Sequence, residues 1–128
     1  MTAAKGTFKV NLVPGETLDD RNGVQLGLAH ISKTFAGDLV GTSETSVMTV
    51  MTPQPAAYVG IERFDGSVHG RNGTFVLQHN AGVMAGEQWM TWKIVETSGT
   101  GDLAGIRGEG QIIIDPGGSH SYELEYEI

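Results

Sequence analysis

Two side chains in the middle of the chain have the chemistry to move protons at a binding site. They are Glu62, in the sequence IERF, and His79, in the sequence VLQHN. Glu62 shares a strand face with Tyr58, Gly60 and Phe64, so its carboxylate is a candidate for burial. A buried carboxylate needs a partner and could serve as a general base, or it could form a structural ion pair or hydrogen bond.

His79 follows Phe75 and Leu77 at intervals of two residues, which places the imidazole on the apolar face of the same predicted strand. Near neutral pH an imidazole can act as an acid, a base or a hydrogen-bond donor. The alternative is a core histidine that is hydrogen-bonded to a backbone carbonyl. We therefore treat His79 and Glu62 as the candidate catalytic residues, with structural roles as their alternatives.

A set of aromatic, sulfur-containing and polar residues lies near the predicted strand ends. Such a mixture is typical of a small-molecule pocket, and from it we predict Tyr58, His79, Trp89 and Tyr122 as the ligand contacts. The remaining members of the set are Met51, Gln78, Met90 and His120. Trp89 and Trp92 fall on opposite faces of one strand, so one of them must lie on the outer wall, where it suggests a subunit interface.

Several classes of function are disfavoured by composition. The 128 residues include no cysteine, so thiolate nucleophiles, thiolate metal sites and disulfides are excluded. The four histidines stand in no metal-ligand spacing, no serine occupies a nucleophile elbow, and we expect neither a metal nor a cofactor. A net charge of -7 without a basic run argues against nucleic acid, and no apolar stretch is long enough to span a membrane. The N-terminus lacks a signal-peptide pattern, so we expect a soluble, cytoplasmic protein.

The elements that must position these residues are strands, because apolar and polar residues alternate with period two almost throughout the chain. Tyr122, Leu124 and Tyr126, for example, alternate with glutamates. We predict a single all-β domain over residues 1–128, with about eight strands joined by hairpins into a closed antiparallel up-and-down barrel. The alternative is a Greek-key sandwich, for which residues 14–23 are the one candidate crossing connection.

Three similar pentapeptides, GDLVG at 37–41, GSVHG at 66–70 and GDLAG at 101–105, are predicted to lie at one end of this barrel. Their glycines would let crowded strands meet at a closed end, whereas a phosphate loop would need a following helix, which we do not predict. Longer connections at 14–23 and 81–86 would surround an open mouth at the other end. We further expect bulges at Gly73 and Gly108.

Four stretches together carry a family resemblance: FAGDLVGTSE, YVGIERFDGSVHGRNGTFVLQHNAG, GTGDLAGIRGEG and HSYELEYEI. They resemble a family of small bacterial proteins known only as a domain of unknown function, over nearly the whole chain. The resemblance implies an antiparallel barrel related to the allene oxide cyclase and lipocalin-like architectures. It implies no activity, and no functional residue can be transferred from it.

Three functions are compatible with the sequence. The first is binding of a small, mostly apolar molecule at the barrel mouth through Tyr58, His79, Trp89 and Tyr122. The second is an enzyme, an isomerase or cyclase in which His79 or Glu62 moves a proton. The third is a structural module with a filled barrel whose outer wall forms a homo-oligomer.

Overall fold

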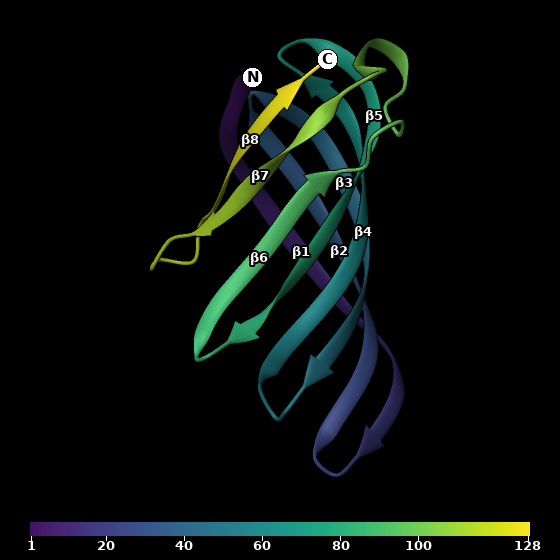
Figure 1. Cartoon of the computed structure of the whole chain (residues 1–128), viewed down its shortest axis with the longest axis vertical. Coiled ribbons are helices and arrows are strands. Elements are labelled where there is room, and N and C mark those ends of the chain that lie inside the picture. Colours follow the sequence, from purple (N-terminus) through teal and green to yellow (C-terminus); the bar gives the residue numbers. More distant parts are fainter.

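The computed structural model describes residues 1–128, and its eight antiparallel strands close into a barrel (Figure 1). Each strand pairs with the next along the chain, and the last pairs with the first, which confirms the predicted all-β up-and-down barrel. The elements are β1 (Thr2–Arg21), β2 (Val24–Gly37), β3 (Leu39–Met51), β4 (Pro55–Val68), β5 (Arg71–Met84), β6 (Glu87–Ile94), the 3-10 turn η1 (Gly101–Leu103), β7 (Arg107–Ile114) and β8 (His120–Glu127). None of the helical structure is long or apolar enough to cross a bilayer.

The core lies inside the barrel, where the alternating side chains of the strands meet. Phe35 packs edge-on against Phe64 with ring centroids 5.4 Å apart, and Phe64 lies 5.1 Å from Phe75. All three rings are buried, and burial of each contributes about 1.5–3 kcal/mol relative to exposure. This aromatic layer fills the end of the barrel that carries both chain termini in Figure 1.

The repeated glycines allow neighbouring backbones to meet at this closed end. Gly41 lies opposite Gly66 on β3 and β4, and a Cβ on Gly66 would stand 2.1 Å from the carbonyl oxygen of Val40. The apolar residue in the middle of each pentapeptide is buried; these residues are Leu39, Val68 and Leu103. No α-helix follows any copy, and the steric explanation is confirmed at Gly37, Gly41 and Gly66. It is wrong at Gly70 and Gly105, where an added Cβ would meet nothing within 4 Å and a positive φ requires glycine instead.

The predicted difference in loop length between the two ends is wrong. At the open end the chain turns within two residues after β1 and after β5, because Asn22, Gly23, Ala85 and Gly86 all adopt positive φ and so form tight hairpins. The longest connection, residues 95–106 between β6 and β7, lies at the closed end and buries Ile106 against the core. This loop runs along the edge of β5 and adds Leu103 and Ile106 to the core of the closed end, whereas the other end is framed by projecting hairpins (Figure 1).

The predicted bulges at Gly73 and Gly108 are also wrong. Gly73 lies directly opposite Gly66, and Gly108 opposite Tyr126, with no register shift at either position. The two-residue turn between β4 and β5 resets the alternation, and this turn points Phe75 and the later residues of β5 inward.

One seam of the barrel is narrow. β6 and β7 pair only where Trp92 lies opposite Gly110 and where Lys93 lies opposite Glu109. Every other neighbouring pair of strands has a longer ladder.

The outer wall carries apolar side chains across three neighbouring strands. Leu28 lies opposite Met48, which in turn lies opposite Val59, and these side chains are 38%, 52% and 56% exposed. A homo-oligomer through this wall stays a prediction, and sedimentation velocity at working concentration is the measurement that decides it.

Candidate functional site

A pocket of about 520 Å³ opens into the barrel at the end opposite the glycine pentapeptides. Of the 18 residues that line it, 12 are hydrophobic, and they come from β1, β2 and β4 to β8. Its volume lies within the roughly 300–1,000 Å³ that is usual for small-molecule sites. The pocket is therefore large enough for a ligand of a few rings or a medium alkyl chain.

Three of the four predicted ligand contacts line this pocket, namely Tyr58, His79 and Trp89. Met90 and His120, from the wider predicted set, line it as well. Met51 and Gln78 do not line it, and Gln78 is exposed on the outer side of β5.

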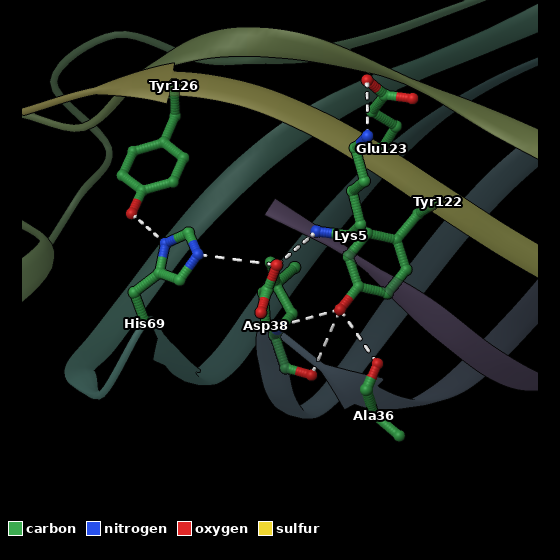
Figure 2. Close-up of polar contacts among 8 residues, drawn as sticks. Lys5, Ala36, Asp38, His69, Tyr122, Glu123 and Tyr126 are labelled. Carbon is green, nitrogen blue, oxygen red and sulfur yellow. Dashed lines mark hydrogen bonds and ion pairs between the residues drawn. The ribbon is translucent and has the colours of Figure 1, made fainter. Parts of the chain in front are cut away.

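Tyr122 lies outside the pocket, in the core of the closed end. Its hydroxyl accepts a hydrogen bond from the backbone N–H of Leu39 at 2.8 Å and donates to the carbonyl of Ala36 at 2.9 Å (Figure 2). The reason is the strand register: β8 pairs with the first residues of β1, so that Tyr122 lies opposite Gly6. A position near the start of β8 is consequently deep in the barrel.

The two tryptophans do lie on opposite faces, as predicted. Trp92 is the interior one and is 1% exposed, whereas Trp89 is 43% exposed at the rim of the pocket. The indole of Trp89 covers Gly82 on β5, where an added Cβ would lie 3.1 Å from the ring. The rim of the pocket thus has an aromatic edge that solvent can reach.

Glu62 is completely buried, and protein groups occupy both of its oxygens. Lys33 Nζ and Trp92 Nε1 each donate to Oε1 at 3.0 Å, and Ser43 Oγ donates to Oε2 at 2.6 Å. Glu62 is not among the residues that line the pocket. This arrangement is that of a structural ion pair reinforced by two further hydrogen bonds.

Lys33 is the one lysine, arginine or acidic residue in the pocket lining, and the sequence analysis did not predict it. It stands between Ser32 and Thr34, which reads as a polar segment, yet it alternates with Ile31 and Phe35 and so shares their inward face. Its side chain is 2% exposed, and the ammonium lies 5.1 Å from the ring centroid of Phe8. The face shared with Phe35 was the signal that could have found it.

His79 lies between the pocket and the buried ion pair. Its Nε2 is 2.9 Å from the hydroxyl of Tyr58, while Nδ1 has no hydrogen-bond partner and lies 3.9 Å from Glu62 Oε1. Burial and the nearby charge of Lys33 lower the pKa of His79 to about 4, although Glu62 acts in the opposite direction. The imidazole is therefore neutral at pH 7, and the carboxylate beside Nδ1 favours the proton on that nitrogen, so that Tyr58 donates to Nε2.

Tyr58 is held as a neutral phenol. Burial raises its pKa above the usual 10, and the negative charge of Glu62 raises it further. The pair of Tyr58 and His79 is therefore uncharged at physiological pH. In addition, no group of three or more histidine or acidic side chains is placed to hold a metal ion.

The buried imidazole should make stability depend on pH. Because the folded pKa of about 4 lies below the ordinary 6.5, the unfolded chain binds a proton that the folded state resists. The free energy of unfolding therefore carries a contribution from the neutral imidazole that is complete above pH 6.5. About 3 kcal/mol of it is lost as the pH falls towards 4. We expect urea unfolding between pH 7 and 4.5 to show a shallower pH slope in His79→Gln than in the wild type. Equal slopes in the two proteins would contradict this prediction.

A second polar cluster, in which Asp38 is central, ties the strands together at the closed end (Figure 2). The Asp38 carboxylate accepts from the backbone N–H of Lys5 at 2.9 Å and lies 3.5 Å from His69 Nε2. His69 Nδ1 is in turn 2.5 Å from the hydroxyl of Tyr126. These contacts join β1, the β2–β3 turn, the β4–β5 turn and β8, far from the pocket.

Replacing Tyr122 by phenylalanine should destabilise the closed end. The change leaves the buried N–H of Leu39 and the carbonyl of Ala36 without their partner, which costs about 1–3 kcal/mol. Tyr126→Phe is the matched control, because its hydroxyl bonds only to the partly exposed His69, and we expect a smaller loss there. Urea unfolding of both variants measures the difference, and an equal effect in the two would show that the Tyr122 hydroxyl has no special role.

Comparisons with known proteins agree with this fold. The profile of a family described as "Protein of unknown function (DUF3224)" matches residues 4–126. A crystal structure of a DUF3224 protein of unknown function from Shewanella oneidensis MR-1 is similar at a TM-score of 0.91 and 35% identity. That similarity covers 100% of this chain and 97% of the other. A search among curated proteins finds no match. The chain belongs to the DUF3224 family of proteins of unknown function.

Proposed function

We propose that this protein binds a small, mostly apolar molecule in the open end of its barrel, in the manner of a lipocalin-like carrier. The observation that supports the proposal is the pocket of about 520 Å³, in which 12 of 18 lining residues are hydrophobic. Tyr58, His79 and Trp89 are the contacts that we assign to the ligand. Such a pocket gains affinity chiefly from the apolar surface that the ligand removes from water.

The charge states of the polar groups favour binding over proton transfer. An isomerase or cyclase would need a group that exchanges protons near neutral pH, and efficient general bases have pKa values close to the working pH. The pKa of His79 is about 4, and the pKa of Tyr58 is raised by burial. Both oxygens of Glu62 already accept hydrogen bonds from protein groups. The enzyme alternative, including the likeness to allene oxide cyclases, therefore has less support than the carrier.

Titration with the neutral apolar fluorophore phenylnaphthylamine tests the proposal. We expect saturable one-to-one binding with micromolar affinity, together with a change in tryptophan emission as the ligand meets Trp89 at the rim. Ala81→Phe should weaken binding at least about tenfold, because Ala81 lines the pocket and a ring there would fill it.

The matched control is the same substitution at the adjacent residue, Asn80→Phe. Asn80 lies opposite Val59 on the outer face, so a ring there should leave the affinity within about twofold. Failure of this fluorophore and of a chemically broad set of apolar probes to bind would overturn the proposal. Binding that Ala81→Phe does not weaken would overturn the assignment to this pocket.

A further inference from the structure

The inner end of the pocket is polar, although most of its wall is not. Lys33, Tyr58 and His79 line it there, and they come from β2, β4 and β5. Glu62 connects them from behind the wall: its Oε1 is 3.0 Å from Lys33 Nζ and 3.9 Å from His79 Nδ1. A ligand that enters the pocket therefore meets a defined set of donors and acceptors at its leading end.

Lys33 has hydrogen-bonding capacity that the protein does not use. An ammonium group carries three N–H donors, and Glu62 Oε1 is the one hydrogen-bond acceptor that Nζ has in the structure. The rings of Phe8 and Trp92 lie near the charge, with centroids 5.1 and 5.7 Å from Nζ, but they offer no oxygen or nitrogen acceptor. The two donors that remain belong to a residue of the pocket wall whose side chain is 2% exposed.

The charge of the site argues against an anionic ligand. Glu62 already balances Lys33, so a carboxylate brought to Nζ would add a net negative charge in a region from which water is excluded. Desolvating that extra charge would cost several kcal/mol that one more ion-pair contact does not fully offset. A neutral oxygen acceptor takes a spare N–H of Lys33 without changing the net charge of the site.

Tyr58 and His79 further restrict the chemical groups that the ligand can present at this end of the pocket. With the proton of the imidazole on Nδ1, the Tyr58 hydroxyl donates to His79 Nε2 and offers the ligand no donor of its own. His79 Nδ1 is buried beside Glu62 Oε1, at 3.9 Å, so Lys33 is then the principal donor to the pocket at this end. A carbonyl oxygen accepts from this donor, and it brings no O–H of its own that would need a further acceptor.

We infer that the ligand is an apolar molecule with a neutral carbonyl group at its leading end, and that Lys33 Nζ donates a hydrogen bond to this carbonyl oxygen. The inference rests on the proposed binding function and adds the chemical class of the ligand to it. A hydrogen bond from a charged donor contributes about 1.5–3 kcal/mol, which corresponds to a preference of at least about tenfold over a ligand that lacks the oxygen.

Three ligands of the same shape test the inference by displacement of phenylnaphthylamine. They are methyl naphthyl ketone, isopropylnaphthalene and naphthoate, which differ in presenting a carbonyl, a hydrocarbon group or a carboxylate. We expect the ketone to bind at least about tenfold more tightly than either of the others. Its infrared carbonyl stretch should also move to lower wavenumber in the complex, as it does on accepting a hydrogen bond from a charged donor.

The outcomes separate this inference from the proposed function. Equal affinity for ketone and hydrocarbon, with an unshifted carbonyl stretch, would overturn the inference while leaving the carrier intact. Tightest binding of naphthoate would overturn the charge argument. If none of the ligands and none of the apolar probes binds, the proposed function and the inference both fail.

A pair of substitutions assigns the preference to Lys33. Lys33→Met combined with Glu62→Gln removes both charges together; the amide oxygen still accepts from Trp92 Nε1, and the amide N–H can donate to Ser43 Oγ. We expect the affinity of this variant for the ketone to fall to that for the hydrocarbon. A ketone preference retained in the folded variant would overturn the role of Lys33, and the carbonyl stretch in the wild type decides the question if the variant does not fold.

Discussion

Replacing Glu62 by glutamine should lower the free energy of unfolding by about 3–5 kcal/mol, the largest effect that we expect from a change of a single functional group. The substitution keeps the shape of the side chain but leaves the ammonium of Lys33 buried without a counter-ion. A loss of this size is a large share of the roughly 5–15 kcal/mol that stabilises a typical domain. Urea unfolding at pH 7 measures it, and a loss of soluble protein is the other form that the same result would take.

Two further variants test whether the loss of stability comes from the buried pair of Lys33 and Glu62. Glu109→Gln makes the same chemical change at a glutamate whose side chain is 69% exposed beside Lys93, and we expect it to cost less than about 1 kcal/mol. Adding Lys33→Met to Glu62→Gln removes the uncompensated charge and should recover most of the loss. A double variant no more stable than Glu62→Gln alone would show that the missing counter-ion is not the cause.

Replacing Gly66 by alanine should destabilise the closed end by at least about 2–3 kcal/mol. The new Cβ would stand 2.1 Å from the carbonyl oxygen of Val40 and 2.8 Å from the Cα of Gly41, and both contacts are with backbone that cannot rotate away. The strands would have to separate at the point where the aromatic layer is packed. Urea unfolding, or the yield of folded protein, is the measurement.

Gly117→Ala is the matched control for this steric argument. A Cβ on Gly117 meets nothing within 4 Å, and the residue lies in the exposed turn between β7 and β8. We expect its effect to stay within about 0.5 kcal/mol of the wild type. Similar losses at Gly66 and Gly117 would mean that chain entropy, and not crowding, explains the need for glycine.

The barrel architecture, and which side chains of most strands point into it, could be predicted from the sequence because both depend on local patterns. Period-two alternation assigns Phe64, Phe75 and His79 to one face, and turn residues such as Asn22 and Gly23 mark where the chain reverses. These signals need no information about which strands are neighbours. They also placed Tyr58 and His79 in the pocket wall.

Other features depend on how the strands are staggered, which alternation does not encode. Tyr122 lies deep in the core because β8 pairs with the first residues of β1, and this offset is a property of the whole barrel. The burial of Lys33 could not be predicted for another reason. A charged residue between two polar neighbours indicates a solvent-exposed side chain, unless its counter-ion on a distant strand is known. The pairing of Lys33 with Glu62 joins β2 to β4 across the interior, beyond the reach of any local pattern.

The narrow seam between β6 and β7 has a consequence for how the molecule moves. Only the positions of Trp92 and Lys93 tie β6 to its neighbour, whereas β2 and β3 are laddered along most of their length. Transient separation needs few broken hydrogen bonds at this place, so amide protons here will exchange with solvent sooner than those of β2 and β3. The barrel therefore behaves as a rolled sheet with one weakly paired edge, and local opening should begin between β6 and β7.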